Sequence, residues 1–117
     1  MKALFILNTA PYGNELIYDG LRLADTLVKR DHNEIRTYLM GDAASAAKQG
    51  QKVPEGFYNL QIMINKLLRG QNGSVGVCGT CMDARGIRAD ELIEGTHRGS
   101  LEELADWSEW ADKVFVF

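Results

Sequence analysis

Residues 75–87 read Val75-Gly76-Val77-Cys78-Gly79-Thr80-Cys81-Met82-Asp83-Ala84-Arg85-Gly86-Ile87. The stretch opens as a short apolar run typical of a buried strand, breaks at glycine and continues into a polar segment. It contains both cysteines of the chain, separated by two residues in a CxxC pattern. In parallel α/β proteins, chemistry is commonly placed where a strand ends and a helix begins. The order of this stretch therefore predicts a thiol site at the end of a strand.

The helix expected beyond Cys78 bears on the reactivity of that thiol. A helix N-terminus carries partial positive charge and free N–H groups, which stabilise a thiolate relative to a thiol. A helix that begins near Thr80 or Cys81 would point these groups at Cys78. A buried and unreactive thiol is the alternative for any single cysteine. The spacing of the pair instead favours thiol chemistry or metal binding.

The composition limits the classes of protein to which the chain can belong. Of its 117 residues, 45% are hydrophobic and 25% are charged, which is typical of a globular protein, and we expect a single domain over residues 1–117. The net charge is −3 and there is no basic run, so we expect neither nucleic acid nor a membrane surface as a partner. The apolar run at residues 3–7 is too short to span a membrane and resembles no secretory signal. We therefore expect a cytoplasmic protein, in which the two cysteines stay reduced.

Apolar strand-like runs alternate along the chain with segments of helical periodicity. We expect strands at residues 3–7, 35–40, 74–77 and 113–117 and helices at residues 15–29, 43–49, 60–69 and 100–111. Residues 89–94 are expected to form a short helix or turn, and residues 95–99 a tight connection or short strand. Asn14 is the expected N-cap of the first helix, Ser100 and Glu103 form a capping-box pattern, and residues 70–73 are a helix stop. The alternation predicts an α/β domain of three layers, flavodoxin-like in general architecture, with a mostly parallel sheet flanked by helices.

Loops that follow parallel strands lie along one edge of a sheet. We therefore expect residues 8–13, 41–42 and 78–81 to meet there. In this arrangement Tyr12, beside Gly13, either donates a hydrogen bond to a thiol or simply packs. Arg85 either lowers the pKa of Cys78 or holds an anion, or it forms an ion pair at the surface or at an interface.

Other polar residues are expected to have structural roles. Asp42 is expected to cap a helix. His32 and His97 lack the short paired spacing of a zinc site, so no metal and no cofactor is expected. Trp107 and Trp110 lie three residues apart on a helix, and both cannot face one small core fully. One of the two is therefore expected at a subunit interface.

Several segments together carry a resemblance to a known family. They are Ala10-Pro11-Tyr12-Gly13, Tyr38-Leu39-Met40-Gly41-Asp42-Ala43, Gly50-Gln51-Lys52, Val77 to Ile87, Gly99-Ser100-Leu101, Ala111-Asp112-Lys113-Val114 and the final Phe117. In their order and spacing the chain resembles the DsrE/DsrF-like family. The resemblance implies a compact α/β sandwich that assembles as a homotrimer or homohexamer.

The resemblance also implies a function in sulfur relay. In such a relay a cysteine carries a persulfide between sulfur donor and sulfur acceptor proteins, with or without sulfurtransferase activity. The sulfur-accepting cysteine of the family matches Cys78. Cys81 is a departure, because the sulfur carriers best associated with this role need one thiol at this place. A second thiol two residues away can attack a persulfide and discharge it.

Two other functions remain open at the level of sequence. One is a non-catalytic oligomeric module that binds a small ligand at the strand-end edge. The other is a dithiol redox protein that uses Cys78 and Cys81, although a fold of thioredoxin type needs a proline facing the thiols. The only prolines are Pro11 and Pro54.

Overall fold

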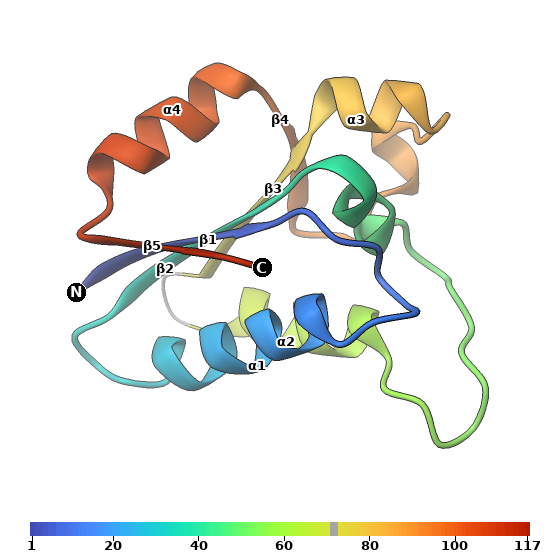
Figure 1. The fold of residues 1–117 in the computed structure, drawn as a ribbon, viewed down its shortest axis with the longest axis horizontal. Helices are drawn as coiled ribbons and strands as arrows, with labels where there is room; N and C mark the ends of the chain where they lie inside the picture. The colour runs from blue at the N-terminus through green and yellow to red at the C-terminus, as the bar shows by residue number, and fades with distance from the viewer. Residues whose placement is uncertain (71–72) are drawn as a thin grey trace.

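The computed structural model describes residues 1–70 and 73–117 and forms a parallel α/β sandwich (Figure 1). Its elements are, in chain order, β1 (Lys2–Leu7), α1 (Leu16–Val28), β2 (Glu34–Leu39), the 3-10 helix η1 (Gly41–Ala47), α2 (Leu60–Arg69), β3 (Gly73–Cys78), α3 (Gly79–Ala84), the 3-10 turn η2 (Ala89–Glu91), β4 (Thr96–Gly99), α4 (Leu101–Trp110) and β5 (Lys113–Val116). Within these residues the sheet has five strands in the order β4-β3-β2-β1-β5, and every pairing is parallel. The predicted fold class is confirmed.

Helices cover both faces of the sheet. Helices α1 and α2 lie together on one face, and α3 and α4 lie on the other (Figure 1). The larger core fills the α1–α2 side, and a smaller cluster around Leu4, Tyr38, Leu104 and Trp107 fills the α4 side. Strand β1 lies between β2 and β5 and is buried on both faces, which explains its continuous apolar sequence.

The starts of the helices differ in detail from the sequence-based predictions. Helix α1 begins one residue later than predicted, with Glu15 as its N-cap, and Asn14 Oδ1 accepts a hydrogen bond from the Leu16 N–H at 3.0 Å. The alanine-rich segment forms a 3-10 helix that begins at Gly41. The predicted helix stop at residues 70–73 includes residues 71–72, which lie outside the described residues.

Helix α4 uses only half of the predicted capping box. Ser100 Oγ accepts the Glu103 N–H at 3.1 Å, but the Glu103 carboxylate contacts His97 Nε2 at 2.7 Å instead of returning to the cap. Leu101, at the start of this helix, is 72% exposed and lies at a pocket beside Cys78. Trp107 is buried, whereas Trp110 is only partly buried, under the Arg36 guanidinium. In the described part of the chain, no helix is both long enough and apolar enough to cross a membrane.

Candidate functional site

The strand ends bring the two cysteines to the carboxyl edge of the sheet. Cys78 is the last residue of β3 and the N-cap of α3, so the register of the sheet sets its position. The segment after β2 reaches the same place, because the Gly41 N–H donates a hydrogen bond to Cys81 Sγ at 3.2 Å. The loops after β2 and β3 therefore meet at the thiols, as the topology predicts.

The Cys78 sulfur accepts hydrogen bonds from the first turn of α3. The Cys81 N–H points at Cys78 Sγ from 3.3 Å, and the Thr80 hydroxyl lies 3.4 Å from the same sulfur. Burial raises the pKa of Cys78, but hydrogen bonds from the side chains and backbone N–H groups of Cys81 and Thr80 lower it by more. The net effect is a pKa below that of an ordinary thiol. Cys78 is therefore the thiol that ionises more easily.

The pKa of Cys81 is shifted in the opposite direction, upward. Burial raises the pKa of Cys81, and the hydrogen bond that its thiol makes with Cys78 raises it further. The Gly41 N–H and the positive charge of Arg85 oppose this shift without cancelling it. Both cysteines are free and partly buried. The pair thus consists of one thiol that favours the anion and a neighbour that keeps its proton.

A pocket of about 450 Å³ opens beside Cys78. Its lining comes from β2, α3 and the segment around the end of β4: Tyr38, Met40, Cys78, Gly79, Thr80, Cys81, Arg98, Gly99, Ser100 and Leu101. The Tyr38 hydroxyl donates to the Ser100 carbonyl at 3.0 Å. Burial raises the pKa of Tyr38 to about 12, with smaller contributions from Cys78, Glu103 and Cys81, so Tyr38 stays neutral next to the thiols. The pocket can admit a small group to the Cys78 sulfur.

Arg85 lies close to the thiol pair but is paired with Asp42. The two side chains form an ion pair of 2.6 Å, and Arg85 also donates to the Cys81 carbonyl at 3.1 Å. The prediction that Asp42 caps a helix is wrong, since its carboxylate binds Arg85 and makes no cap hydrogen bond. Arg85 therefore connects α3 to η1.

The sequence reasoning missed Arg98 and Tyr38. Arg98 lines the pocket next to Cys78 and forms a double hydrogen bond with Asp83 at 2.8 and 3.0 Å. The short strand at residues 96–99 was the feature of the sequence that could have identified Arg98. In the β3–β4 register Val77 pairs with Arg98 and Cys78 with Gly99, so a strand there brings this segment beside the thiols. Tyr38 lies near the end of β2, the strand next to β3, and Met40 follows it by two positions. Side chains at this spacing point to the same face of a sheet, so the alternation also indicated that the two lie together.

Tyr12 and Gly13 lie elsewhere. The Tyr12 hydroxyl accepts the Leu60 N–H at 3.2 Å, and its ring stacks on Tyr58 with centroids 5.7 Å apart. Together with Gly13 it lines a separate pocket of about 300 Å³. The structure thus brings Cys78, Cys81 and Arg85 together and places Tyr12 and Gly13 at a different opening.

The two histidines, His32 and His97, make their hydrogen bonds with groups other than the thiols. His97 contacts Glu103 through Nε2, and His32, in the turn before β2, accepts a bond from the N-terminal ammonium group at 2.7 Å through its carbonyl. In residues 1–70 and 73–117, no group of three or more histidine, cysteine, aspartate or glutamate side chains is arranged to hold a metal ion.

The alkylation rates of the two thiols are expected to depend differently on pH. Because the pKa of Cys78 is lowered, its reactive thiolate persists to lower pH than that of an ordinary thiol, while Cys81 reacts only at higher pH. Iodoacetamide rates measured across pH, with the modified residue located by peptide mapping, check this order. Thr80→Ala removes one hydrogen bond and is expected to move the Cys78 profile to higher pH. A profile in which Cys81 reacts at the lower pH would contradict the assignment.

Comparison with known proteins supplies the context for this site. The model of the DsrE/DsrF-like family matches residues 1–117. Protein YchN of Escherichia coli is 45% identical over 99% of this chain and 98% of its own length. The uncharacterized protein MJ0989 of Methanocaldococcus jannaschii is 32% identical over the full length of both chains.

Solved structures have the same fold as this chain. The crystal structure of the E. coli ychN protein aligns with a TM-score of 0.92 at 44% identity, covering 99% of this chain and 98% of the other. The protein of unknown function BT1422 from Bacteroides thetaiotaomicron aligns with a TM-score of 0.71 at 17% identity over 98% of this chain and 94% of its own, which is a likeness of fold alone.

Proposed function

This chain belongs to the DsrE/DsrF-like family, and from that membership and the geometry of its thiol pair we propose that it is a sulfur-relay protein that carries a persulfide on Cys78. Two free cysteines, close together, suit a reducing cytoplasm, and that is the proposed location. The proposed partners are a sulfur donor and a sulfur acceptor, each presenting a thiol or persulfide at the pocket beside Cys78.

The observation that carries this proposal is the position of Cys78 as an N-cap whose sulfur accepts the Cys81 N–H. The donors that favour the thiolate, the Cys81 N–H and the Thr80 hydroxyl, also lie beside a persulfide formed on Cys78, whose negative charge is on its terminal sulfur. The pocket of about 450 Å³ has room for the added sulfur and the end of an incoming side chain. The site is therefore suited both to attack on a sulfane sulfur and to holding the product.

The loading step is a thiol exchange that needs no oxidant. The Cys78 thiolate attacks the terminal sulfur of the donor persulfide, a bond forms between Cys78 Sγ and that sulfur, and the sulfur–sulfur bond of the donor breaks. The donor thiolate leaves with the electron pair. Unloading to an acceptor is the same exchange in reverse, in which the acceptor thiolate attacks the terminal sulfur and Cys78 leaves as thiolate.

Cys81 provides a second route for unloading. After it loses its proton, Cys81 attacks Cys78 Sγ, the bond from Cys78 to the terminal sulfur breaks, and hydrosulfide leaves. A disulfide between Cys78 and Cys81 remains and needs a cellular dithiol to reduce it. Because the pKa of Cys81 is raised, this route is expected to be slow at neutral pH.

The direct test is sulfur loading of the wild-type protein. The protein is incubated with polysulfide, separated from excess reagent and weighed by intact mass spectrometry. The proposal expects the gain of one sulfur atom, located on Cys78 by peptide mapping. A protein whose mass does not change under conditions that load a known persulfide carrier would contradict it.

We also propose that the chain assembles as a homo-oligomer, a trimer or hexamer. Support comes from edge strand β5, where Val114 and Val116 are 46% and 60% exposed. They pair in register with Leu4 and Ile6 of β1 and so share their face of the sheet. An edge strand with exposed valines is a surface that other chains tend to cover.

Light scattering is expected to give the mass of several chains. Val116→Asp is expected to lower this mass, because a carboxylate cannot be buried unpaired in an interface. Ile62→Asp is the matched control, since Ile62 is 53% exposed on α2, on the other side of the sheet. A monomer mass for the wild type at micromolar concentration would rule the proposal out.

A further inference from the structure

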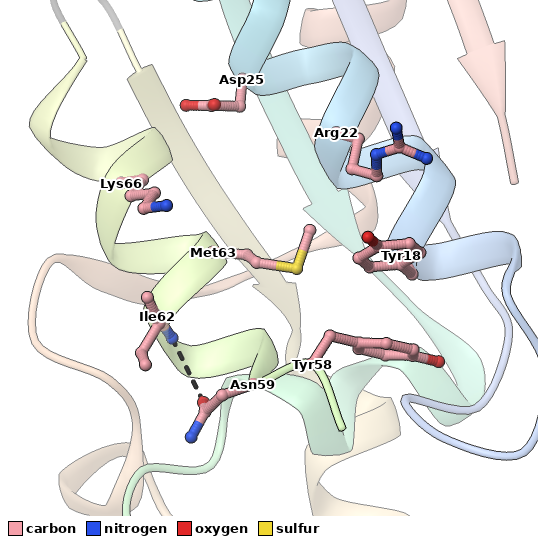
Figure 2. A pocket seen from close by; sticks show the side chains of 8 residues that line it. All are labelled: Tyr18, Arg22, Asp25, Tyr58, Asn59, Ile62, Met63 and Lys66. Atoms are coloured by element: carbon pink, nitrogen blue, oxygen red, sulfur yellow. Dashed lines mark hydrogen bonds between the residues drawn. The ribbon is translucent and has the colours of Figure 1, made fainter. Parts of the chain in front are cut away.

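A third pocket lies between α1 and α2, on the face of the sheet away from α3, and the sulfur chemistry above does not use it. Figure 2 shows it from close by. It measures about 300 Å³, within the lower range of small-molecule sites. The two helices supply most of its lining side chains: Tyr18, Arg22, Asp25, Ile62, Met63 and Lys66.

Two tyrosines, Tyr18 and Tyr58, form the aromatic part of the lining of this α1–α2 pocket. The rings of Tyr18 and Tyr58 stack with centroids 4.2 Å apart and an angle of 19° between their planes. Met63 extends from α2 into the gap between the helices, toward Tyr18 (Figure 2). Aromatic side chains and a flexible, polarizable thioether together form a lining that suits a flat ring.

The residues that line the pocket carry two cations, Arg22 and Lys66, and one carboxylate, Asp25. Arg22 and Lys66 are both exposed, and Arg22 lies over the Tyr18 ring, 5.2 Å from its centroid. Asp25 is the carboxylate among the lining residues, and its Oδ2 already binds Lys29 Nζ at 2.7 Å, outside the lining. The ion pair of Arg22 with Asp19 is 3.5 Å long and exposed, so it competes weakly with a ligand. Two cations are therefore available to an incoming anion.

We propose that the α1–α2 pocket binds a small aromatic anion, a flat ring that carries a carboxylate, sulfonate or phosphate group. The ring packs against Met63 and the Tyr18–Tyr58 stack, and the anionic group lies at Arg22 and Lys66. This site is independent of Cys78, because the sheet separates α1 and α2 from α3 (Figure 1). The two pockets also share no lining residue.

The test uses three probes that share one ring and differ in charge. They are naphthoate, the uncharged naphthylmethanol and the cationic naphthylmethylammonium. Binding to the 117-residue chain is followed through the methyl NMR signals of its four methionines. Met63 reports on the α1–α2 pocket, Met40 reports on the thiol pocket, and buried Met82 is an internal control.

Naphthoate is expected to shift the Met63 signal until it saturates and to leave the Met40 and Met82 signals in place. Lys66→Gln and Arg22→Gln are each expected to weaken the binding about fivefold, as loss of one exposed charge contact would. Arg30→Gln, an exposed arginine just beyond α1, makes the same change in net charge and is expected to leave binding unchanged. Naphthylmethanol is expected to bind about fivefold more weakly than naphthoate.

Three results would overturn the proposal. The first is a Met63 signal that does not move at millimolar naphthoate. The second is equal or tighter binding of the cationic probe, which would assign the pocket to the opposite charge. The third is a shift of the Met40 signal alone, which would place the ligand at the thiols. None of these results depends on whether Cys78 accepts sulfur.

Discussion

Cys78→Ser is expected to abolish sulfur loading, because a hydroxyl does not ionise near neutral pH and cannot attack a sulfane sulfur at a useful rate. The serine is close in size and stays at the N-cap position, where it remains a good capping residue. The fold is therefore expected to survive while the chemistry is lost. Intact mass after exposure to polysulfide measures the result, and unchanged circular dichroism shows that the variant is folded.

Cys81→Ala is the matched control and is expected to load and to hold the sulfur longer than the wild type. The substitution removes the hydrogen bond of the Cys81 thiol but keeps the backbone N–H that points at Cys78 from 3.3 Å. The Cys78 thiolate is thus less stabilised, and loading slows without being lost. The longer lifetime follows because the internal attack on the persulfide is no longer available.

Other outcomes of the same experiment would select other functions. Sulfur found on Cys81 with Cys78 unmodified would reverse the two roles. Rapid formation of a disulfide between the two residues, with no gain of sulfur under any loading condition, would favour a dithiol redox protein. Thiols that resist both sulfur and alkylating reagents would leave the non-catalytic binding module as the better account.

Phe5→Ala is expected to lower the free energy of unfolding by about 3 to 5 kcal/mol. Phe5 is fully buried in β1, and its ring stacks on Phe115 with centroids 4.8 Å apart and on Phe117 at 6.2 Å. Its removal leaves a cavity in the core between the sheet and helices α1 and α2, since these packed elements close only part of the gap. A loss of this size is a large part of the about 5 to 15 kcal/mol that a typical domain has.

Phe57→Ala provides the comparison for the same chemical change at the surface. Phe57 is 64% exposed, so its removal is expected to change the free energy of unfolding by no more than about 0.5 kcal/mol. Urea unfolding followed by circular dichroism measures both variants at matched protein concentration. Equal effects of the two substitutions would contradict the burial of Phe5 in the core between the sheet and helices α1 and α2.

The elements and their order followed from local patterns. The apolar run at residues 3–7 predicted a strand, and such continuous apolar runs are typical of parallel strands covered by helices on both sides. The position of a thiol at the end of the strand over residues 74–77 was predicted from the glycine that follows and from the polar segment beyond it. Asn59 is a cap that the sequence analysis did not name, although an asparagine before a helix is a common start signal.

Contacts between distant segments were where the sequence-based reasoning failed. Asp42 and Arg85 are 43 residues apart, and neither residue by itself indicates the other as its partner. Tyr12 follows β1 and shares the carboxyl edge with Cys78, but its hydroxyl accepts a bond from the start of α2 instead. A side chain as long as tyrosine reaches in a direction that depends on its rotamer and on neighbouring elements, which strand order does not specify.

The sequence by itself determined the strand and helix order, the parallel class of the sheet and the presence of a thiol pair after the third strand. These depend on periodicity and on turn residues, which act over a few positions along the chain. Only the tertiary structure decided that the pKa of Cys81 is raised, which arginine lies at the pocket and where the tyrosines gather. Each of these depends on burial and on hydrogen bonds between segments far apart in the chain. The Gly41 N–H at Cys81, Arg98 beside Cys78 and the Tyr18–Tyr58 stack meet only when the sheet and its helices are packed.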